Sequence, residues 1–274
     1  MILAVYSSKD LAGVNIANQV MNNFPFSKTG ETFQEKSVYS VEIGEKQVIL
    51  VTLKDETVYA QNLPEHFSNL ELVVFLSRHS SQSGKPTLSV HTPGNFAEAE
   101  LGGLPRTVSV CPAIAMRDAL KALQQFKTEM QLDYEVSYEC THHGPSLKVP
   151  TMFVELGSSP SQWTDSEAAE AVAKAAMQSI ANFRICGQTA VLGIGGPHYN
   201  QRFTQMSLND EVVFGHMIPK YALQYVDAET LSQCVERTLE KIDHALLDWK
   251  GIKSQDKPKL LKTLTELKLP YRKI

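Results

Sequence analysis

Residues 71–81 read Glu-Leu-Val-Val-Phe-Leu-Ser-Arg-His-Ser-Ser, an apolar run that ends in a polar loop containing a histidine. A continuous run of this kind is typical of a strand that is covered on both faces. Similar runs predict further strands at Ile2–Tyr6, Ser37–Ile43, Gln47–Leu53, Thr87–His91, Glu135–Cys140, Thr151–Leu156 and Thr189–Gly193. The short turn Gly44-Glu45-Lys46 predicts an antiparallel hairpin, so we expect a mixed sheet.

Helical patterns lie between these strands, at Asp10–Phe24, Ala113–Met130, Ala168–Phe183 and Asp227–Trp249. Pro112 is well placed to open the second helix, and Thr164–Glu167 has the form of a capping box before the third. Strands that alternate with helices predict an α/β sandwich. We expect one domain over residues 1–274, with a basic C-terminal segment at 250–274.

Composition excludes several classes of protein. The chain has 274 residues, of which 43% are hydrophobic and 20% are charged, which is typical of a globular protein and not of a disordered one. No apolar run reaches the roughly 18 residues of a membrane helix. The four cysteines form no Cys-x-x-Cys pair, which argues against a disulfide framework and a thiolate zinc site. We therefore expect a cytoplasmic protein with no membrane partner.

Charge is unevenly distributed along the chain. Residues 250–274 hold eight basic and two acidic residues, a net charge of +6, whereas residues 1–249 carry −10. A basic end on an acidic body can contact an anionic polymer such as RNA. A solvated terminal helix is the alternative, and charge alone does not decide between them.

Six of the eight histidines fall in loops or at predicted strand ends: His79, His91, His142, His143, His198 and His216. In open α/β sheets, ligands bind beyond the carboxyl ends of the strands, so we expect several imidazoles to meet in one crevice. Imidazole is the commonest protein ligand of zinc, and a catalytic zinc takes about three protein ligands and one water. The sequence therefore predicts a zinc site, with one or two ions.

Other residues near these histidines qualify the prediction. Glu155 can supply an oxygen ligand or a general base. His142 and His143 are adjacent, and neighbours on a strand face opposite sides, so only one of them is expected to face the crevice. The loop Ser80–Pro86 lacks the spacing of a nucleotide-binding P-loop, and no Gly-x-Ser-x-Gly elbow exists. A nucleoside triphosphatase and a serine hydrolase are both disfavoured.

Taken in order, five motifs resemble those of the archaeal and plant type of D-aminoacyl-tRNA deacylase: Ser77–Ser81, Leu88–Asn95, Thr141–Pro145, Glu155–Ser158 and Gly195–Tyr199. The resemblance covers nearly the whole chain. It implies a zinc-dependent enzyme that hydrolyses the ester between a D-amino acid and tRNA, a proofreading reaction of translation. It also implies a three-layer α/β/α sandwich similar to phosphorylase and peptidyl-tRNA hydrolase folds.

The resemblance and the residue chemistry together give the expected site. We expect metal ligands at His91, His142, His143 and His198, and catalytic groups at His79, Lys85 and Glu155, with Lys85 as an oxyanion donor. We expect tRNA contacts at Lys257, Lys259, Lys262, Arg272 and Lys273. The expected partner is tRNA carrying a D-amino acid, not DNA, and the expected state is a monomer or small homo-oligomer.

Two other functions stay open at this point. One is a metal-free enzyme on the same scaffold, phosphorylase-like or peptidyl-tRNA hydrolase-like, in which the histidines transfer protons. The other is a non-enzymatic RNA-binding protein, which the basic tail alone supports.

Overall fold

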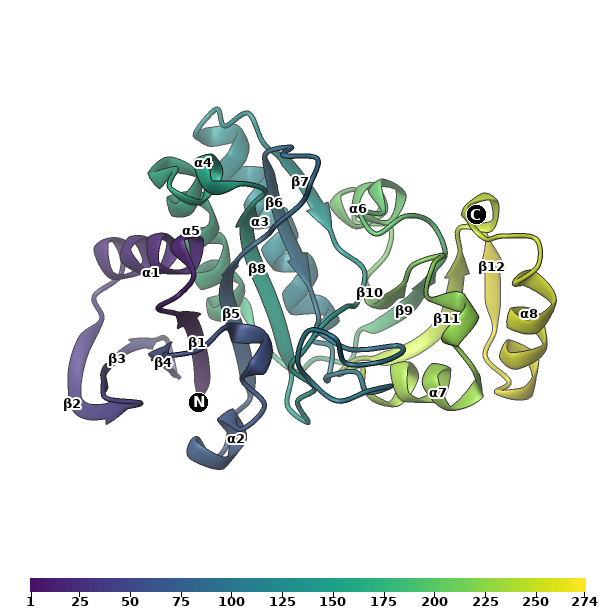
Figure 1. Cartoon of the computed structure of the whole chain (residues 1–274), viewed down its shortest axis with the longest axis horizontal. Coiled ribbons are helices and arrows are strands. Elements are labelled where there is room, and N and C mark those ends of the chain that lie inside the picture. Colours follow the sequence, from purple (N-terminus) through teal and green to yellow (C-terminus); the bar gives the residue numbers. More distant parts are fainter.

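The computed structural model describes residues 1–274 and contains two β-sheets (Figure 1). The strands of the larger sheet are, in spatial order, β2 (Ser27–Phe33), β3 (Lys36–Ile43), β4 (Lys46–Leu53), β1 (Ile2–Ser7), β5 (Leu72–Arg78), β8 (Thr151–Gly157), β6 (Thr87–His91) and β7 (Glu135–Tyr138). The β3–β4 hairpin is antiparallel, and β6 runs antiparallel to β8, whereas β4, β1, β5 and β8 are parallel. The predicted mixed sheet is confirmed.

The smaller sheet lies at the other end of the molecule (Figure 1). Its strands are β10 (Phe214–Ile218), β9 (Thr189–Ile194), β11 (Lys241–Leu247) and β12 (Tyr271–Lys273). All neighbouring pairs in this sheet are parallel. The carboxyl ends of its four strands therefore lie at one edge.

Three long helices cover one face of the larger sheet: α1 (Leu11–Asn23), α3 (Ala113–Glu129) and α5 (Ser166–Asn182). Side chains along each strand alternate between the two faces. In β1, Ile2 and Ala4 belong to the main core beneath these helices, whereas Leu3 and Val5 belong to a smaller cluster on the opposite face, with Leu63.

The remaining helices are shorter: α2 (Leu63–His66), α4 (Pro160–Trp163), α6 (Gln201–Leu208), α7 (Ala228–Glu236) and α8 (Lys257–Glu266). Single 3₁₀ turns lie at Thr57–Tyr59, Leu223–Tyr225 and Trp249–Gly251. None of the helices combines the length and hydropathy that crossing a bilayer requires.

The predicted helix Asp227–Trp249 is wrong over its second half. The helix α7 ends at Glu236, and β11 follows as the strand between β9 and β12. The strand pairs with β9 along its length, and its apolar end Ala245–Leu247 also pairs with β12, so burial in a sheet overrides the helical spacing. His244, expected on a helix, therefore lies on a strand.

The predicted capping box at Thr164–Glu167 is also wrong by one residue. Asp165 is the N-cap of α5, and its carboxylate accepts hydrogen bonds from the backbone N–H groups of Glu167 and Ala168. The Thr164 hydroxyl instead donates to the Pro160 carbonyl. An aspartate is as good an N-cap as threonine, so the neighbouring residue takes the role.

Three strands were not predicted from the sequence. The edge strand β2 is polar and almost wholly exposed, so it has no apolar signature. In β10, Gly215 and His216 interrupt the apolar run, and β12 has only three residues, too few to show a period. The basic C-terminal segment consequently comprises both α8 and β12.

A buried carboxylate that precedes a strand of the smaller sheet caps α3, a helix that covers the larger sheet. Pro112 precedes this helix and has no side-chain group that can cap it. Glu240, just before β11, accepts hydrogen bonds from the backbone N–H groups of Ala113 (2.9 Å) and Ile114 (3.0 Å). A carboxylate at a helix N-terminus also interacts favourably with the helix dipole.

Replacing Glu240 by alanine should lower the free energy of unfolding by about 2–3 kcal/mol, because two buried N–H groups lose their acceptors. Glu240→Gln should lose less, since the amide keeps one oxygen. Urea unfolding measures both values. The exposed Glu236 provides the control, and Glu236→Ala should change stability by less than about 0.5 kcal/mol. Equal losses at positions 236 and 240 would contradict the capping role.

Candidate metal and catalytic centre

The candidate site is a cavity of about 440 Å³ lined by His79, Glu139, His142, His143, Glu155, His198 and Tyr199 among others. It opens on the face of the larger sheet that α1, α3 and α5 leave free. His91 pairs with Phe153 across β6 and β8, and Phe153 belongs to the smaller cluster on this face. Glu155 follows Phe153 by two residues, so its side chain has the same orientation.

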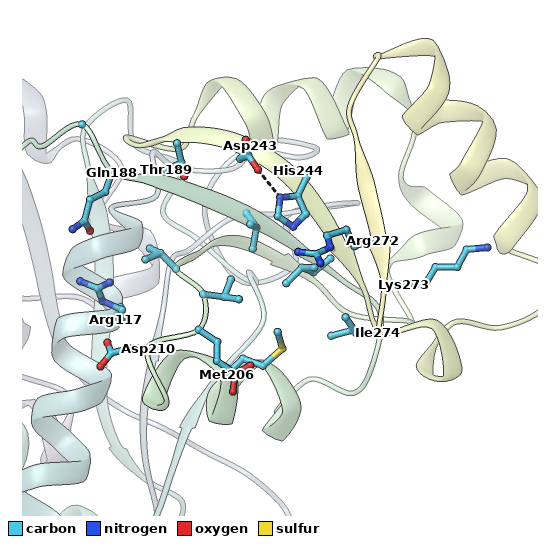
Figure 2. Close-up of a pocket in the computed structure, with 16 residues that line it drawn as sticks. Arg117, Gln188, Thr189, Met206, Asp210, Asp243, His244, Arg272, Lys273 and Ile274 are labelled. Atoms are coloured by element: carbon cyan, nitrogen blue, oxygen red, sulfur yellow. Dashed lines mark hydrogen bonds and ion pairs between the residues drawn. The ribbon is translucent and has the colours of Figure 1, made fainter.

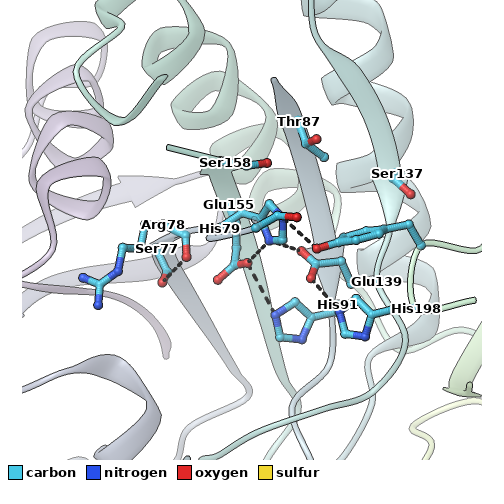
Figure 3. Close-up of polar contacts among 12 residues, drawn as sticks. Ser77, Arg78, His79, Thr87, His91, Ser137, Glu139, Glu155, Ser158 and His198 are labelled. Atoms are coloured by element: carbon cyan, nitrogen blue, oxygen red, sulfur yellow. Dashed lines mark hydrogen bonds and ion pairs between the residues drawn. The ribbon is translucent and has the colours of Figure 1, made fainter. Parts of the chain in front are cut away.

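The expectation that the histidines meet beyond a common edge of parallel strands is therefore wrong for the larger sheet. Because β6 runs antiparallel to β8, the carboxyl ends of β5 and β6 point in opposite directions. His79 and His91 nevertheless lie at the same site, because both are close to one carboxylate. Glu155 projects from within β8 between them (Figure 3).

Three imidazoles form a compact cluster, which we call the tri-histidine cluster: His91, His142 and His143. Their ring centroids are 4.2 to 4.9 Å apart, and one nitrogen from each lies within 4.8 Å of the others. His142 and His143 are not on a strand, and His143 has a φ of 40°, in the left-handed region. This turn places both adjacent rings on the same side, where a strand would separate them.

Hydrogen bonds fix the orientation of two of these rings. His142 Nδ1 lies 2.9 Å from the Cys140 carbonyl oxygen, and His143 Nδ1 lies 2.7 Å from the Gly144 carbonyl oxygen. A carbonyl only accepts, so each Nδ1 carries the proton and donates it. Each Nε2 is then left with a free lone pair, which is the usual arrangement of imidazoles that bind metal.

His91 is fully buried, and neither of its ring nitrogens has a hydrogen-bond partner. Burial and the neighbouring His143 lower the pKa of His91 to about 3, and burial lowers the pKa of His143 to about 4. The pKa of His142 also lies well below its ordinary value, mainly because of burial. All three rings are neutral near pH 7, so the donor set fits a metal ion that prefers nitrogen.

Glu139 lies beside this cluster and was not singled out from the sequence. Its carboxylate is fully buried, accepts a hydrogen bond from His198 Nε2 (3.0 Å) and lies 3.1 Å from His79 Nδ1 (Figure 3). Burial alone would raise the pKa of Glu139, but His198 and His79 outweigh it and hold this pKa well below its usual range. Glu139 is therefore ionised.

The pKa of Glu155 is shifted in the opposite direction. Burial, followed by the charge of Glu139, raises the pKa of Glu155 well above its usual range. Its Oε2 lies 3.7 Å from His91 Nε2 and 3.8 Å from His79 Nδ1. Two carboxyl groups with pKa values shifted in opposite directions are typical of sites that hold and transfer protons.

Two tyrosines contact the two histidines that lie beside Glu139. The hydroxyl of Tyr199 lies 2.8 Å from His79 Nε2, and that of Tyr221 lies 3.0 Å from His198 Nδ1. Because His198 donates through Nε2 to an ionised carboxylate, its Nδ1 accepts from Tyr221. Burial raises the pKa of Tyr221 to about 12, so its hydroxyl remains a donor.

The structure places the other predicted site residues away from the tri-histidine cluster. Lys85 is largely exposed, pairs with Glu135 and lines an adjoining cavity that also contains His79 and Tyr199. The predicted tRNA contacts Lys257, Lys259, Lys262, Arg272 and Lys273 lie on α8 and β12. His216 is buried within β10, between the Thr141 hydroxyl and the Arg237 carbonyl oxygen, and takes no part in the site.

The rim of the cavity carries two exposed apolar side chains, although Glu56 and Arg78 also line the cavity. Tyr59 and Leu101 line it and are 54% and 57% exposed. Gly102 holds this rim in place, because it has a φ of +70° and a Cβ there would lie 2.0 Å from the Val58 carbonyl oxygen. The Gly144 N–H donates to the Leu101 carbonyl oxygen, which joins the rim to the histidine loop.

Comparison with known proteins identifies the family. A model of the D-aminoacyl-tRNA deacylase family matches residues 66–272. A D-aminoacyl-tRNA deacylase of Thermococcus onnurineus is 34% identical over 272 residues, 97% of each chain, and one of Methanocaldococcus jannaschii is 35% identical over 265 residues, 93% of this chain and 92% of that one.

A solved structure agrees over the full length. The crystal structure of AF0625, a conserved protein of unknown function, has a TM-score of 0.87 at 30% identity and covers 100% of this chain and 95% of that one. The resemblance predicted from the motifs is confirmed: the chain belongs to the D-aminoacyl-tRNA deacylase family.

Proposed function

We propose that this protein hydrolyses the ester between a D-amino acid and tRNA, with a single zinc ion held by His91, His142 and His143. The observation that carries the proposal is the tri-histidine cluster, in which three neutral imidazoles face one another and His91 has no hydrogen-bond partner. Family membership supplies the substrate class. Charged tRNA is used in translation, so the cytoplasm is the expected compartment.

Three imidazoles match the ligand number of a catalytic zinc, which keeps one position for water or substrate. Zinc, when bound, supplies a Lewis acid that activates water near neutral pH. His198 is the fourth predicted ligand, but its Nε2 donates to Glu139. We therefore assign His198 to orienting Glu139 and not to the metal.

Glu155 and His79 are the groups placed to handle protons. The neutral form of Glu155 is favoured, so its carboxyl group can give a proton to the departing ribose oxygen. Glu139 and Tyr199 hold the ring of His79 from its two nitrogens. The position of His79 is thus fixed beside Glu155. Lys85, paired with Glu135 outside this cavity, has no part in the proposal.

The two alternative functions make different demands on the same residues. A metal-free enzyme would leave the nitrogens of a buried His91 without any partner, which is costly. A pure RNA-binding protein would have no use for a cavity with buried carboxyl groups. Zinc analysis of the purified protein addresses the first alternative, and the following assay addresses the second.

Wild-type protein should release D-tyrosine from D-Tyr-tRNA and leave L-Tyr-tRNA intact under the same conditions. A chelator should stop the reaction, and added zinc should restore it, because water activation depends on the metal. Release of labelled tyrosine measures both rates. Equal cleavage of the two enantiomers would defeat the stereochemical claim, and full activity in chelator would defeat the metal claim.

His91→Ala and His143→Ala should each lose the bound zinc and reduce kcat/KM by more than about a hundred-fold, since each removes a ligand. Elemental analysis gives the zinc content per chain, independently of activity. His216→Gln is the matched control, because His216 is also a buried histidine with a lowered pKa. Retention of stoichiometric zinc in both alanine variants would refute the ligand assignment.

A further inference from the structure

We infer that Trp249 and two lysines, Lys257 and Lys273, form a binding site for phosphates of the single-stranded 3′ end of tRNA. We call these three residues the lysine–tryptophan clasp. The inference rests on the proposed function, because it concerns how the substrate of that reaction reaches the cavity. It narrows the predicted RNA contacts from five cations of the basic tail to two, and it adds an aromatic residue.

The clasp holds two ammonium groups against one indole ring. Lys257 Nζ lies 4.4 Å and Lys273 Nζ lies 3.9 Å from the centroid of the Trp249 ring. A cation over an aromatic face is attracted by the negative face of the ring, which restricts where a flexible lysine points. Trp249 thereby keeps two positive charges near each other in spite of their repulsion.

Neither ammonium group has an anionic partner. No carboxylate lies within 4.0 Å of Lys257 or Lys273, whereas Lys262 on the same helix is 3.7 Å from Glu266. Lys259 instead donates to the Gln224 carbonyl oxygen. Of the cations predicted to contact tRNA, Lys259 and Lys262 are thus already bonded or paired, whereas Lys257 and Lys273 have no anionic partner and hold their ammonium groups over Trp249.

Arg272 is separated from the clasp by the alternation of side chains along β12. Figure 2 shows Arg272 turned into a second cavity beside His244, whereas Lys273, which also lines this cavity, extends its ammonium group away from it. Only Lys273 of this pair can therefore act together with Lys257.

The clasp lies at the carboxyl edge of the smaller sheet, the edge that delivers His198. The Asp248 N–H donates to the Ile194 carbonyl oxygen at the end of β9, and the Trp249 N–H donates to the Ile274 carbonyl oxygen beyond β12. His198 follows β9 by a short Gly-Gly-Pro segment. Adjacent strands are about 4.8 Å apart, so the clasp is about 5–10 Å along the edge from the strand that supplies His198.

A phosphodiester chain is the ligand that suits this position. In this proposal, the tRNA strand whose terminal ribose carries the ester leaves the cavity beside His198, and its next phosphates pass along the sheet edge. Lysine ammonium groups bind phosphates as point charges and independently of base sequence. The clasp consequently contributes to the binding of tRNA and not to the chemical step.

The double variant Lys257→Gln/Lys273→Gln should raise KM for D-Tyr-tRNA about ten-fold at 0.15 M salt and change kcat by less than about two-fold. The slope of log KM against log salt should fall by about 1.4, because each single-strand phosphate contact contributes about 0.7. The matched control is Lys241→Gln/Lys268→Gln, which removes the same charge from exposed lysines at the opposite edge of the same sheet. Its KM should change less than two-fold.

Trp249→Leu should also raise KM several-fold although it removes no charge, and Trp249→Phe should restore most of the loss because it keeps an aromatic face. Circular dichroism checks that these variants are folded. Equal effects of the two lysine pairs would show that only net charge matters, and an unchanged KM in the clasp variant would overturn the inference outright. If wild-type protein fails to cleave D-Tyr-tRNA, the proposed function fails instead.

Discussion

The buried charge of Glu139 is the constraint on which the site depends. A carboxylate removed from water is very unfavourable unless it is paired and hydrogen-bonded. Its two partners come from different sheets, since His79 follows β5 of the larger sheet and His198 follows β9 of the smaller one. Glu139 can therefore stay ionised only while both sheets keep their relative position, so the same contact stabilises the assembly of the sheets and shapes the cavity.

In the tri-histidine cluster, unlike at Glu139, burial keeps the titratable groups uncharged. Burial there keeps His91 and its two neighbours neutral, which leaves lone pairs available for a metal ion. A few ångströms away, Glu139 keeps its charge because His198 donates a hydrogen bond to it and His79 Nδ1 lies 3.1 Å from it. Glu155 lies between the two environments, with its proton favoured by burial and by Glu139. The cavity thus places a neutral nitrogen donor set, a fixed negative charge and a proton-holding carboxyl group side by side.

The sequence predicted the residues of this site better than their arrangement. The motifs identified Glu155 and four histidines that line the cavity, but the explanation from parallel strand ends does not hold. It depended on the direction of β6, which the sequence of Thr87–His91 does not reveal. The pairing of His142 with His143 depends on a left-handed φ at a residue that is not glycine. Glu139 was missed although it lies only three residues before His142, because its importance comes from His79 and His198, which are remote in sequence. Similarly, the spacing of Asp227–Trp249 fits both a helix and a short helix followed by a buried strand, and only the pairing with β9 decides between them.

In the smaller sheet, a site residue does lie beyond the carboxyl end of a parallel strand, because His198 follows β9. The two sheets therefore contribute to the site in different ways, one through a face and one through an edge. The cavity lies where a face of the larger sheet meets the carboxyl edge of the smaller one. A space of about 440 Å³ can admit the end of a single strand but not a duplex. Under the proposed function, the cavity therefore receives the unpaired end of the tRNA with its amino acid. Under the proposed function, affinity for the rest of the tRNA comes from outside the cavity, and the all-parallel sheet offers a surface for it, because the carboxyl edge that leads to His198 also carries the ends of β11 and β12.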